Sequence, residues 1–176
     1  MTMKLSVQAL RLTLRPGSDK NNKSLYSFNM KKFNIRVYGI LIKDGKVLVS
    51  DEYIKGNHIT KFPGGGLEFG EGTIDCVKRE FIEEMDLPIE VTSHFYTTDF
   101  FVASAFAADN QVVSIYYLVR PEGEIKKATS IEPHNYLLEN GAQSFRWIHL
   151  DHLKQDDLTL IIDKKVVEMI KELFNS

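Results

Sequence analysis

The chain has 176 residues, of which 43% are hydrophobic and 26% are charged, a composition typical of a globular protein rather than a disordered or fibrous one. Its one cysteine, Cys76, excludes an intrachain disulfide and favours a reducing, cytoplasmic location. The longest largely apolar run, residues 100–107, is far too short to span a membrane.

The net charge of −2 conceals two segments of opposite sign. Residues 1–32 carry seven basic residues and one acid, a balance of +6, which leaves −8 for residues 33–176. An acidic body disfavours a broad nucleic-acid-binding surface. Residues 15–24 have loop composition, so we expect residues 1–32 to be a flexible extension that the chemistry does not need, and residues 33–176 to form one domain. Met30 offers an alternative translation start.

The first regular pattern lies over residues 33–42, where apolar and polar residues alternate and then give way to an apolar run, which predicts a strand. Asp44-Gly45 is typical of a hairpin turn with positive φ values, so residues 46–50 are the expected return strand. A polar loop is expected after it, ending at the glycine run 64–66.

The period changes to that of a helix over residues 73–85. Four apolar residues share one face of this helix: Ile74, Val77, Phe81 and Met85. We expect Thr73 to cap the helix at its start and Pro88 to prevent its continuation.

Residues 91–107 and 112–119 are predicted to be paired strands with a turn at 109–110, and residues 145–150 another strand. Asp163 is expected to cap a final helix. The apolar face of that helix holds Val166, Ile170, Leu173 and Phe174. Strands on both sides of one helix, with a closing helix, indicate a mixed α/β domain.

Three glutamates, Glu80, Glu83 and Glu84, fall on one face of the predicted helix, because residues three and four apart are neighbours there. Such carboxylates repel one another unless a cation neutralises them, and their oxygens suit Mg²⁺ or Mn²⁺. The glycine run allows the backbone to approach a ligand closely, so we expect the carbonyl of Gly64 to join the metal shell. Arg79 is placed to hold Glu71 or another carboxylate.

The alternative for these glutamates is a solvated helix face with ordinary pairing between side chains four residues apart. Residues 75–86 contain five acids but only two basic residues, Lys78 and Arg79. This shortage of basic partners favours the metal site over the solvated face.

This stretch resembles the signature of the Nudix hydrolases, Gly-x5-Glu-x7-Arg-Glu-U-x-Glu-Glu-x-Gly-U, where U is aliphatic or aromatic. The matching residues are Gly65, Glu71, Arg79, Glu80, Phe81, Glu83, Glu84 and Leu87. Asp86 is the one departure, because the family has glycine there, but aspartate tolerates the left-handed conformation that ends such a helix. The resemblance covers residues 33–174.

The resemblance implies an α/β/α sandwich around a mixed sheet, and an enzyme that cleaves a pyrophosphate bond in a nucleoside diphosphate linked to another group. That substrate is a nucleoside triphosphate, an oxidised nucleotide or a nucleotide sugar. By the same analogy Glu80 and Glu84 bind Mg²⁺ or Mn²⁺, and Glu83 is a third ligand or the base that acts on water, with Arg79 beside them in the catalytic set. The acidic charge of residues 33–176 and the short apolar runs lead us to expect no nucleic-acid or membrane partner, and the resemblance leaves a homodimer open.

Several other residues have two interpretations each. Arg36 and Lys61 contact substrate phosphates or are solvated cations, and Glu68 is a peripheral ligand or a surface residue. Glu139 is a further carboxylate of the site, of the kind that some relatives supply from a loop, or an ordinary loop residue, which we favour. Cys76 is expected to be a small buried residue rather than a nucleophile. Three aromatic residues stack on a base or belong to the core: Tyr38, Phe101 and Tyr116. The five histidines lack metal-ligand spacing.

Two other functions share this fold. A module that senses a nucleotide or nucleotide sugar without turnover usually loses some of the glutamates, whereas this chain keeps them all. An isoprenoid diphosphate isomerase needs a catalytic cysteine outside the helix, and Cys76 lies inside it. The metal-dependent hydrolase is therefore the primary hypothesis.

Overall fold

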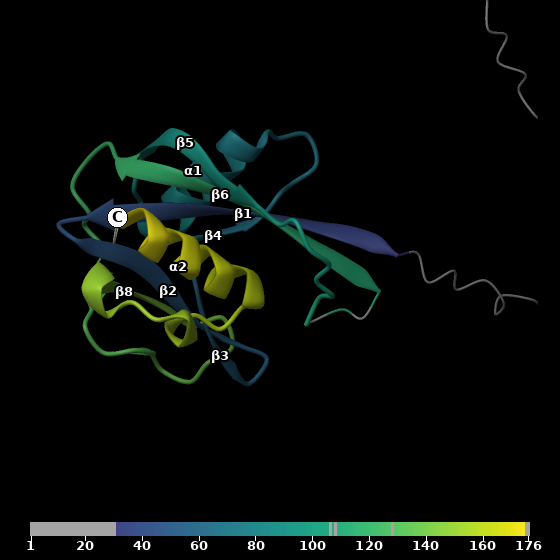
Figure 1. The fold of residues 1–176 in the computed structure, drawn as a ribbon. Helices are drawn as coiled ribbons and strands as arrows, with labels where there is room; N and C mark the ends of the chain where they lie inside the picture. The colour runs from purple at the N-terminus through teal and green to yellow at the C-terminus, as the bar shows by residue number, and fades with distance from the viewer. Residues whose placement is uncertain (1–30, 106, 108, 128, 175–176) are drawn as a thin grey trace, which may run out of the picture.

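The computed structural model describes residues 31–105, 107, 109–127 and 129–174. Two α-helices and eight strands follow one another in chain order: β1 (Lys32–Lys43), β2 (Lys46–Ile54), β3 (Asn57–Lys61), β4 (Gly64–Gly66), α1 (Thr73–Met85), β5 (Ile89–Thr97), β6 (Asn110–Pro121), β7 (Thr129–Ser130), β8 (Gln143–His149) and α2 (Ile161–Phe174). The strands form one mixed sheet in the order β5-β6-β1-β2-β8-β7, with β3 added to β2 and β4 added to β1. The two helices cover opposite faces of this sheet, which gives the expected α/β/α sandwich (Figure 1).

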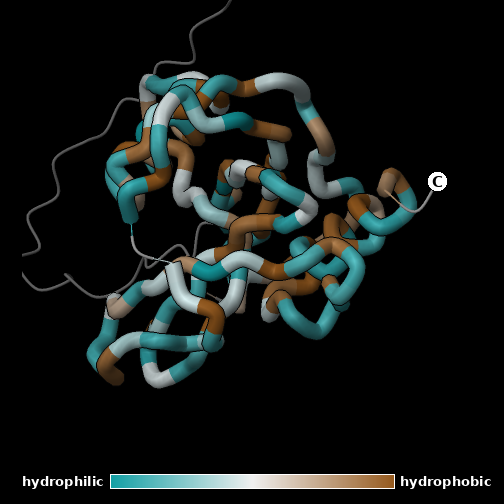
Figure 2. Tube along the Cα trace, turned by 90° about the vertical axis from the view of Figure 1, so that its left-hand side faces the viewer, coloured by the Kyte–Doolittle hydropathy of each residue, from teal (hydrophilic) through white to brown (hydrophobic). Residues whose placement is uncertain are grey.

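Strand β1 shows why both faces need a helix. Successive side chains of a strand point to opposite sides. Tyr38 and Ile40 pack in the cluster that α2 completes, whereas Val37 and Leu41 pack in the cluster that α1 completes. Figure 2 accordingly shows hydrophobic and hydrophilic stretches alternating along the coloured part of the chain instead of separating into two halves.

The first hairpin is confirmed, because Asp44 and Gly45 have φ values of 50° and 70°. The polar loop expected after residue 50 is wrong: β2 runs to Ile54 and turns through Lys55-Gly56 into β3. The apolar alternation that marks strands is missing here because this hairpin buries polar side chains instead. Four polar residues of this hairpin are buried: Ser50, Asp51, Thr60 and Lys61.

The first strand of the second pair is shorter than predicted, whereas the second, β6, extends beyond the expected residues 112–119 at both ends and includes Asn110 of the expected turn. β5 ends at Thr97 and pairs antiparallel with β6, so the continuous strand expected over residues 98–107 is wrong, although Ala103 within this segment still forms an isolated antiparallel bridge with Gln111. The Thr98 hydroxyl donates to the Ser114 carbonyl at 3.1 Å and accepts the Ser114 N–H at 2.9 Å. The Thr98 backbone N–H also donates to that carbonyl at 3.0 Å, so both the side chain and the backbone of Thr98 bind Ser114 where the regular pairing ends.

Helix α1 spans the predicted residues, but Thr73 is not its cap. The N-cap is Gly72, and the Thr73 hydroxyl instead lies 2.7 Å from the Tyr117 hydroxyl. At the other end Asp86 adopts the left-handed conformation at φ 51°, and its N–H donates to the Ile82 carbonyl. The predicted tolerance of aspartate at this position is therefore confirmed.

Helix α2 begins at Ile161, so Asp163 lies inside its first turn and is not the cap. Its buried carboxylate accepts a hydrogen bond from the Tyr116 hydroxyl, a partner from the middle of the sheet. Val166 and Ile170 are buried as expected. Three residues assigned to the apolar helix faces are exposed instead: Ile74, Leu173 and Phe174.

The prediction for the basic segment falls almost wholly on residues 1–30, which lie outside the described residues. β1 starts at Lys32, one residue before the expected start of the domain. None of the described helices is both long and apolar enough to cross a membrane.

Candidate active site

Packing against the sheet fixes the orientation of α1. Val77, Phe81 and Met85 are buried, so the opposite side of the helix faces away from the core. Phe81 lies directly over Gly39, where an added Cβ would come within 2.5 Å of the ring. This close approach holds the turn that carries Glu80, Glu83 and Glu84 at a set height above β1 and β4.

The glycine run forms β4, which pairs antiparallel with Arg36–Tyr38 of β1. Gly64 has a φ of 134°, and a Cβ there would lie 2.2 Å from the Val37 carbonyl oxygen. At Gly65 a Cβ would lie 2.2 Å from Oε1 of Glu80. Glycine at these positions therefore lets the backbone pair with β1 while leaving room for the Glu80 carboxylate.

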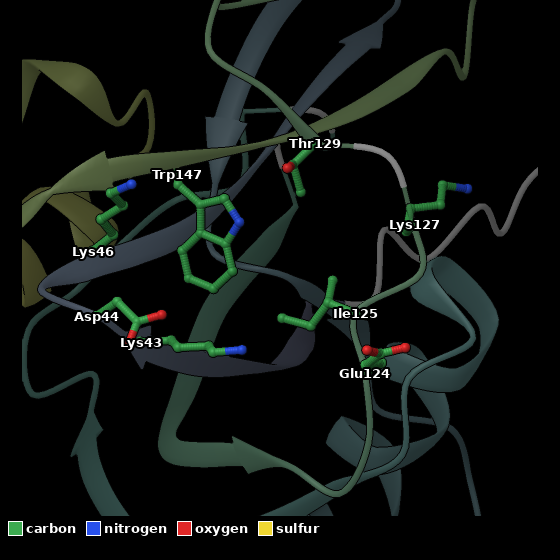
Figure 3. A pocket seen from close by; sticks show the side chains of 8 residues that line it. All are labelled: Lys43, Asp44, Lys46, Glu124, Ile125, Lys127, Thr129 and Trp147. Carbon is green, nitrogen blue, oxygen red and sulfur yellow. The ribbon is translucent and has the colours of Figure 1, made fainter.

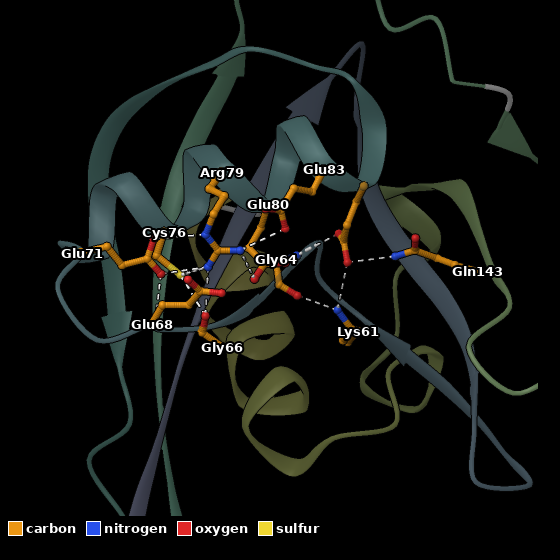
Figure 4. Close-up of polar contacts among 11 residues, drawn as sticks. Lys61, Gly64, Gly66, Glu68, Glu71, Cys76, Arg79, Glu80, Glu83 and Gln143 are labelled. Carbon is orange, nitrogen blue, oxygen red and sulfur yellow. Dashed lines mark hydrogen bonds and ion pairs between the residues drawn. The ribbon is translucent and has the colours of Figure 1, made fainter.

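Arg79 binds several groups around the glutamates (Figure 4). Its Nη2 and Nε donate to the two carboxylate oxygens of Glu71 at 2.8 and 3.1 Å, and Nη2 also donates to the Gly66 carbonyl at 3.1 Å. Its Nη1 lies 3.0 Å from Glu80 and 3.1 Å from Glu83. The hydrogen bonds from Arg79 lower the pKa of Glu71 to about 2, so Glu71 is a fixed anion that orients Arg79.

A second basic residue, Lys61, lies near Glu84, whereas Arg79 contacts Glu80 and Glu83. Its ammonium donates to the Gly64 carbonyl at 2.6 Å, lies 2.8 Å from Oε1 of Glu52 and 3.8 Å from Oε1 of Glu84. Burial by itself lowers the pKa of Lys61, but the Glu84 and Glu52 carboxylates more than offset it and raise that pKa. Lys61 is therefore a charged ammonium in a largely enclosed place.

Glu84 is the most constrained of the three helix glutamates. Oε2 accepts the Gly64 N–H at 3.3 Å, and Oε1 accepts the Gln143 amide N–H at 3.0 Å. Burial raises the pKa of Glu84, and Lys61 partly offsets that rise. Glu83, by contrast, is 58% exposed and has Arg79 as its ion-pair partner.

The other predicted contact residues lie as follows. Arg36 is half-buried and donates through Nε to the Tyr38 hydroxyl at 2.7 Å, while Glu68 is exposed and its N–H donates to Glu71 at 2.8 Å. The solvated alternative for Lys61 is wrong, because its side chain is only 5% exposed. Tyr38 and Tyr116 are core residues with ring centroids 5.2 Å apart.

Other expectations concern groups outside the glutamate face. Phe101 and Glu139 are exposed. Cys76 is buried as expected, and burial together with Glu71 raises the pKa of its thiol to about 12, which excludes a reactive thiolate.

A pocket of about 470 Å³ lies elsewhere, at the turn between β1 and β2 (Figure 3). Its lining shares no residue with the glutamate face. The lining residues are Lys43, Asp44, Lys46, Glu124, Ile125, Lys127, Thr129 and Trp147. Lysines and acids are mixed around the indole ring, so charge favours no single class of ligand here.

The donor chemistry of the glutamate face fits a divalent cation. Glu80, Glu83, Glu84 and the Gly64 carbonyl supply only hard oxygen atoms, and Gly65 leaves the space that the Glu80 carboxylate needs. Within the described ranges no three acidic, histidine or cysteine side chains already converge as a metal site. Lys61 and Arg79 explain this, because each draws carboxylates toward its own cationic group.

Two polar residues of this site were missed by the sequence reasoning. Glu52 comes from β2 and Gln143 from β8, and the Gln143 amide contacts both Glu52 and Glu84. Glu52 lay in the segment interpreted as a polar loop. The Lys55-Gly56 turn signal, read together with the return to β3, is the feature that would have placed it on a strand.

Comparison with known proteins gives a consistent result. The NUDIX domain family model matches residues 31–169. No curated protein matches the sequence significantly. A NUDIX hydrolase from Nitrosomonas europaea has a TM-score of 0.57 at 14% identity, covering 81% of this chain and 73% of that one.

Two further solved structures have the same fold. The MutT NUDIX hydrolase from Burkholderia pseudomallei has a TM-score of 0.57 at 21% identity, covering 77% of this chain and 96% of its own. A UDP-X diphosphatase has a TM-score of 0.54 at 17% identity, with coverages of 88% and 67%. At these identities the similarity establishes the fold and not the substrate.

Proposed function

The chain belongs to the NUDIX domain family, and from this premise we propose that it is a metal-dependent hydrolase that cleaves a pyrophosphate bond in a nucleoside diphosphate linked to another group. The substrate is a nucleoside triphosphate, an oxidised nucleotide or a nucleotide sugar. The observation that carries the proposal is the face of three glutamates on α1, set against a glycine strand whose Gly65 leaves room for the Glu80 carboxylate.

Glu80, Glu84 and the Gly64 carbonyl would hold Mg²⁺ or Mn²⁺ in this proposal. A bound ion of this kind neutralises phosphate charge and activates phosphorus toward water. Glu71 and Arg79 act as positioning residues, because Arg79 links Glu71 to Glu80 and Glu83. Glu83 is the most exposed of the three glutamates, which supports a role as the base or as a third, adjustable ligand.

Substrate contacts are assigned to residues at the rim of the site. Arg36 pairs with Gly66 in the register of β1 and β4, so its guanidinium lies at the glycine strand, where a phosphate is expected. Glu68 lies in the exposed turn before Glu71 and is a peripheral ligand in this scheme. Lys61 lies at the same strand, where its ammonium donates to the Gly64 carbonyl and lies beside Glu52, so a phosphate would be a third acceptor for its three N–H groups.

The test is a panel of nucleoside triphosphates, oxidised nucleotides and nucleotide sugars, supplied with Mg²⁺, with release of phosphate or pyrophosphate measured. Glu84→Gln should lower turnover by more than about 100-fold, the scale of losing a key electrostatic stabiliser. The matched control is Glu168→Gln on α2, an exposed glutamate far from α1 in the fold. Turnover of no panel member, with Glu84→Gln indistinguishable from wild type, would reject the proposal.

A chelator extends this test to binding. Residues 68–86 hold seven acids and two basic residues, so an anionic substrate meets net negative charge there. Affinity for a polyphosphate nucleotide should largely disappear when divalent ions are removed. Calorimetry that detects binding with Mg²⁺ but no turnover of any panel member would favour the sensing module instead.

A further inference from the structure

We propose that Lys61 is a built-in cation of this site, one that competes with a divalent metal ion for oxygens of Gly64 and Glu84 and thereby sets how tightly that ion is held. The inference rests on the proposed function in one respect, that these oxygens are metal ligands. It adds a residue that the family signature does not contain, because Lys61 precedes Gly65 by four positions.

The contacts of the ammonium carry the inference. It donates to the Gly64 carbonyl at 2.6 Å and lies 3.8 Å from Oε1 of Glu84, two of the oxygens assigned to the metal ion. Figure 4 shows these contacts converging on Lys61 from α1 and the glycine strand. An ammonium and a divalent cation repel each other, so both cannot lie beside the same oxygens at full strength.

Glu52 stabilises the Lys61 ammonium in this position and remains its partner when a metal ion binds. Its Oε1 lies 2.8 Å from the Lys61 ammonium, and the same oxygen accepts hydrogen bonds from Ser50 at 3.1 Å and from Gln143 at 3.2 Å. A carboxylate held by neutral donors is a fixed partner for Lys61 that no metal assignment claims. When an ion takes the Gly64 and Glu84 oxygens, the ammonium retains Glu52.

The strand register places Lys61 in this position. Lys61 pairs with Ser50 across the β2–β3 hairpin, so its side chain lies on the same side of the sheet as Ser50 and Glu52. The chain then turns through Phe62 and Pro63, which brings the Gly64 carbonyl within reach of the same side chain three residues later. Glu84 reaches this point from α1, and its Oε2 accepts the Gly64 N–H at 3.3 Å.

The experiment measures Mn²⁺ binding by titration calorimetry in the absence of nucleotide. Lys61→Met should bind Mn²⁺ about tenfold more tightly than wild type, because a competing positive charge has been removed. The control is Lys43→Met, which removes the same charge from an exposed lysine at the β1–β2 turn and should leave the affinity unchanged. Unchanged or weaker binding by folded Lys61→Met overturns the proposal.

Lys61→Met removes the ammonium that pairs with Glu52 and Glu84, and the loss of this largely buried cation is expected to lower the stability of the protein. A second comparison therefore uses Glu52→Gln alone and Glu52→Gln combined with Lys61→Met, in which the pair is replaced by two neutral side chains. The double variant should bind Mn²⁺ about tenfold more tightly than Glu52→Gln. Equal or weaker binding by the double variant overturns the proposal, as does the absence of Mn²⁺ binding in every form.

The outcome is separable from that of the hydrolase test. Tighter Mn²⁺ binding without Lys61, in a protein that turns over no nucleotide, supports the role of Lys61 and rejects the proposed activity. Identical Mn²⁺ affinities in a protein that hydrolyses a nucleotide reject the role of Lys61 alone.

Discussion

Asp51 and Glu52 are neighbours in β2, and they show how differently the two sides of one sheet use a carboxylate. Asp51 lies on the side of Val47 and Val49 and is fully buried. Its oxygens accept hydrogen bonds from Arg146 at 2.7 Å and from the Thr60 hydroxyl at 2.6 Å. Every strong partner of Asp51 is another group of the protein, held in place by the strands.

Glu52 lies on the other side of the strand, toward α1. It shares the Lys61 ammonium with Glu84 and the Gly64 carbonyl, and both glutamates retain some exposure to solvent. The Lys61 ammonium therefore has more than one favourable arrangement, because a cation from solution can take the Glu84 and Gly64 oxygens while Glu52 keeps the ammonium. A fully buried carboxylate with fixed partners therefore stabilises the fold. A carboxylate that shares its cation and keeps some exposure to solvent, such as Glu84, can instead exchange that cation for a metal ion.

Asp163 is a second buried carboxylate on the α2 side. It is fully buried and accepts from the Tyr116 hydroxyl, and its Oδ2 has no hydrogen-bond partner among the described side chains and backbone. Burial raises the pKa of Asp163 to about 7, and the hydrogen bond from Tyr116, which lowers that pKa, offsets only part of the rise. We therefore expect the carboxylates on the α2 side to affect mainly stability, and those on the α1 side to affect mainly ligand binding.

The largest effect on stability is expected for Asp51→Asn. It leaves Arg146 buried without its anion, and breaking such a pair costs about 3–5 kcal/mol of the free energy of unfolding. Urea unfolding measures the loss, and Mn²⁺ affinity measured on the folded fraction should be unchanged. The control is Asp156→Asn, which breaks an exposed ion pair with Lys164 and should leave stability nearly unaltered. Wild-type stability in Asp51→Asn would contradict the comparison.

The pH dependence of stability tests Asp163. Its pKa rises from 3.8 in the unfolded chain to about 7 in the fold, so folding favours the protonated form. The stabilisation is fully present below pH 3.8 and is lost as pH rises through about 7, a change of up to about 4 kcal/mol. Asp163→Asn cannot titrate, so its stability relative to wild type should increase between pH 4 and pH 8. Parallel stability curves for the two proteins would show that Asp163 does not titrate as described.

Gly65→Ala should perturb the α1 side with little loss of stability. The added Cβ displaces the Glu80 carboxylate, which is the flexible end of a side chain and can move at little cost in folding energy. We expect turnover and Mn²⁺ affinity to fall about tenfold, the effect of misplacing a catalytic group. The matched control is Gly123→Ala, where an added Cβ meets nothing within 4 Å. A large loss of stability with unchanged Mn²⁺ affinity would show that Gly65 serves the fold and not the metal site.

The smallest effect is expected at the N-terminus. Deletion of residues 1–29 should leave turnover unchanged, because the basic segment contributes none of the residues assigned to the site. The measurement is kcat/KM on the substrate found in the panel, compared with the full chain. A folded but inactive truncated protein would show that the segment takes part in the chemistry.

Local patterns predicted the parts of the fold that local interactions decide. The ends of α1 follow from its apolar period and from Pro88, and the turn at Asp44-Gly45 follows from its need for positive φ. The spacing of Glu80, Glu83 and Glu84 places them on one helix face whatever lies around the helix. Thr73 failed as a cap because Tyr117, far away in the sequence, takes its hydroxyl.

The partners of these glutamates depend on strand register and could not be read from the sequence. Gln143 reaches Glu84 because β8 pairs with β2 so that Gln143 lies opposite Glu52. A shift of one residue would move Glu52 to the side where Asp51 now lies.

The sequence by itself determined the glutamate face and the glycine run before it, since both depend on spacing within one short segment, whereas the pairing of that run with β1 as a strand was decided by the tertiary structure. Only the tertiary structure decided that Lys61 and Glu52 share that face, while Asp51 and Asp163 are buried on the opposite side. The physical reason is that a side chain's neighbours in a sheet come from distant segments whose register is set by the packing of the whole core.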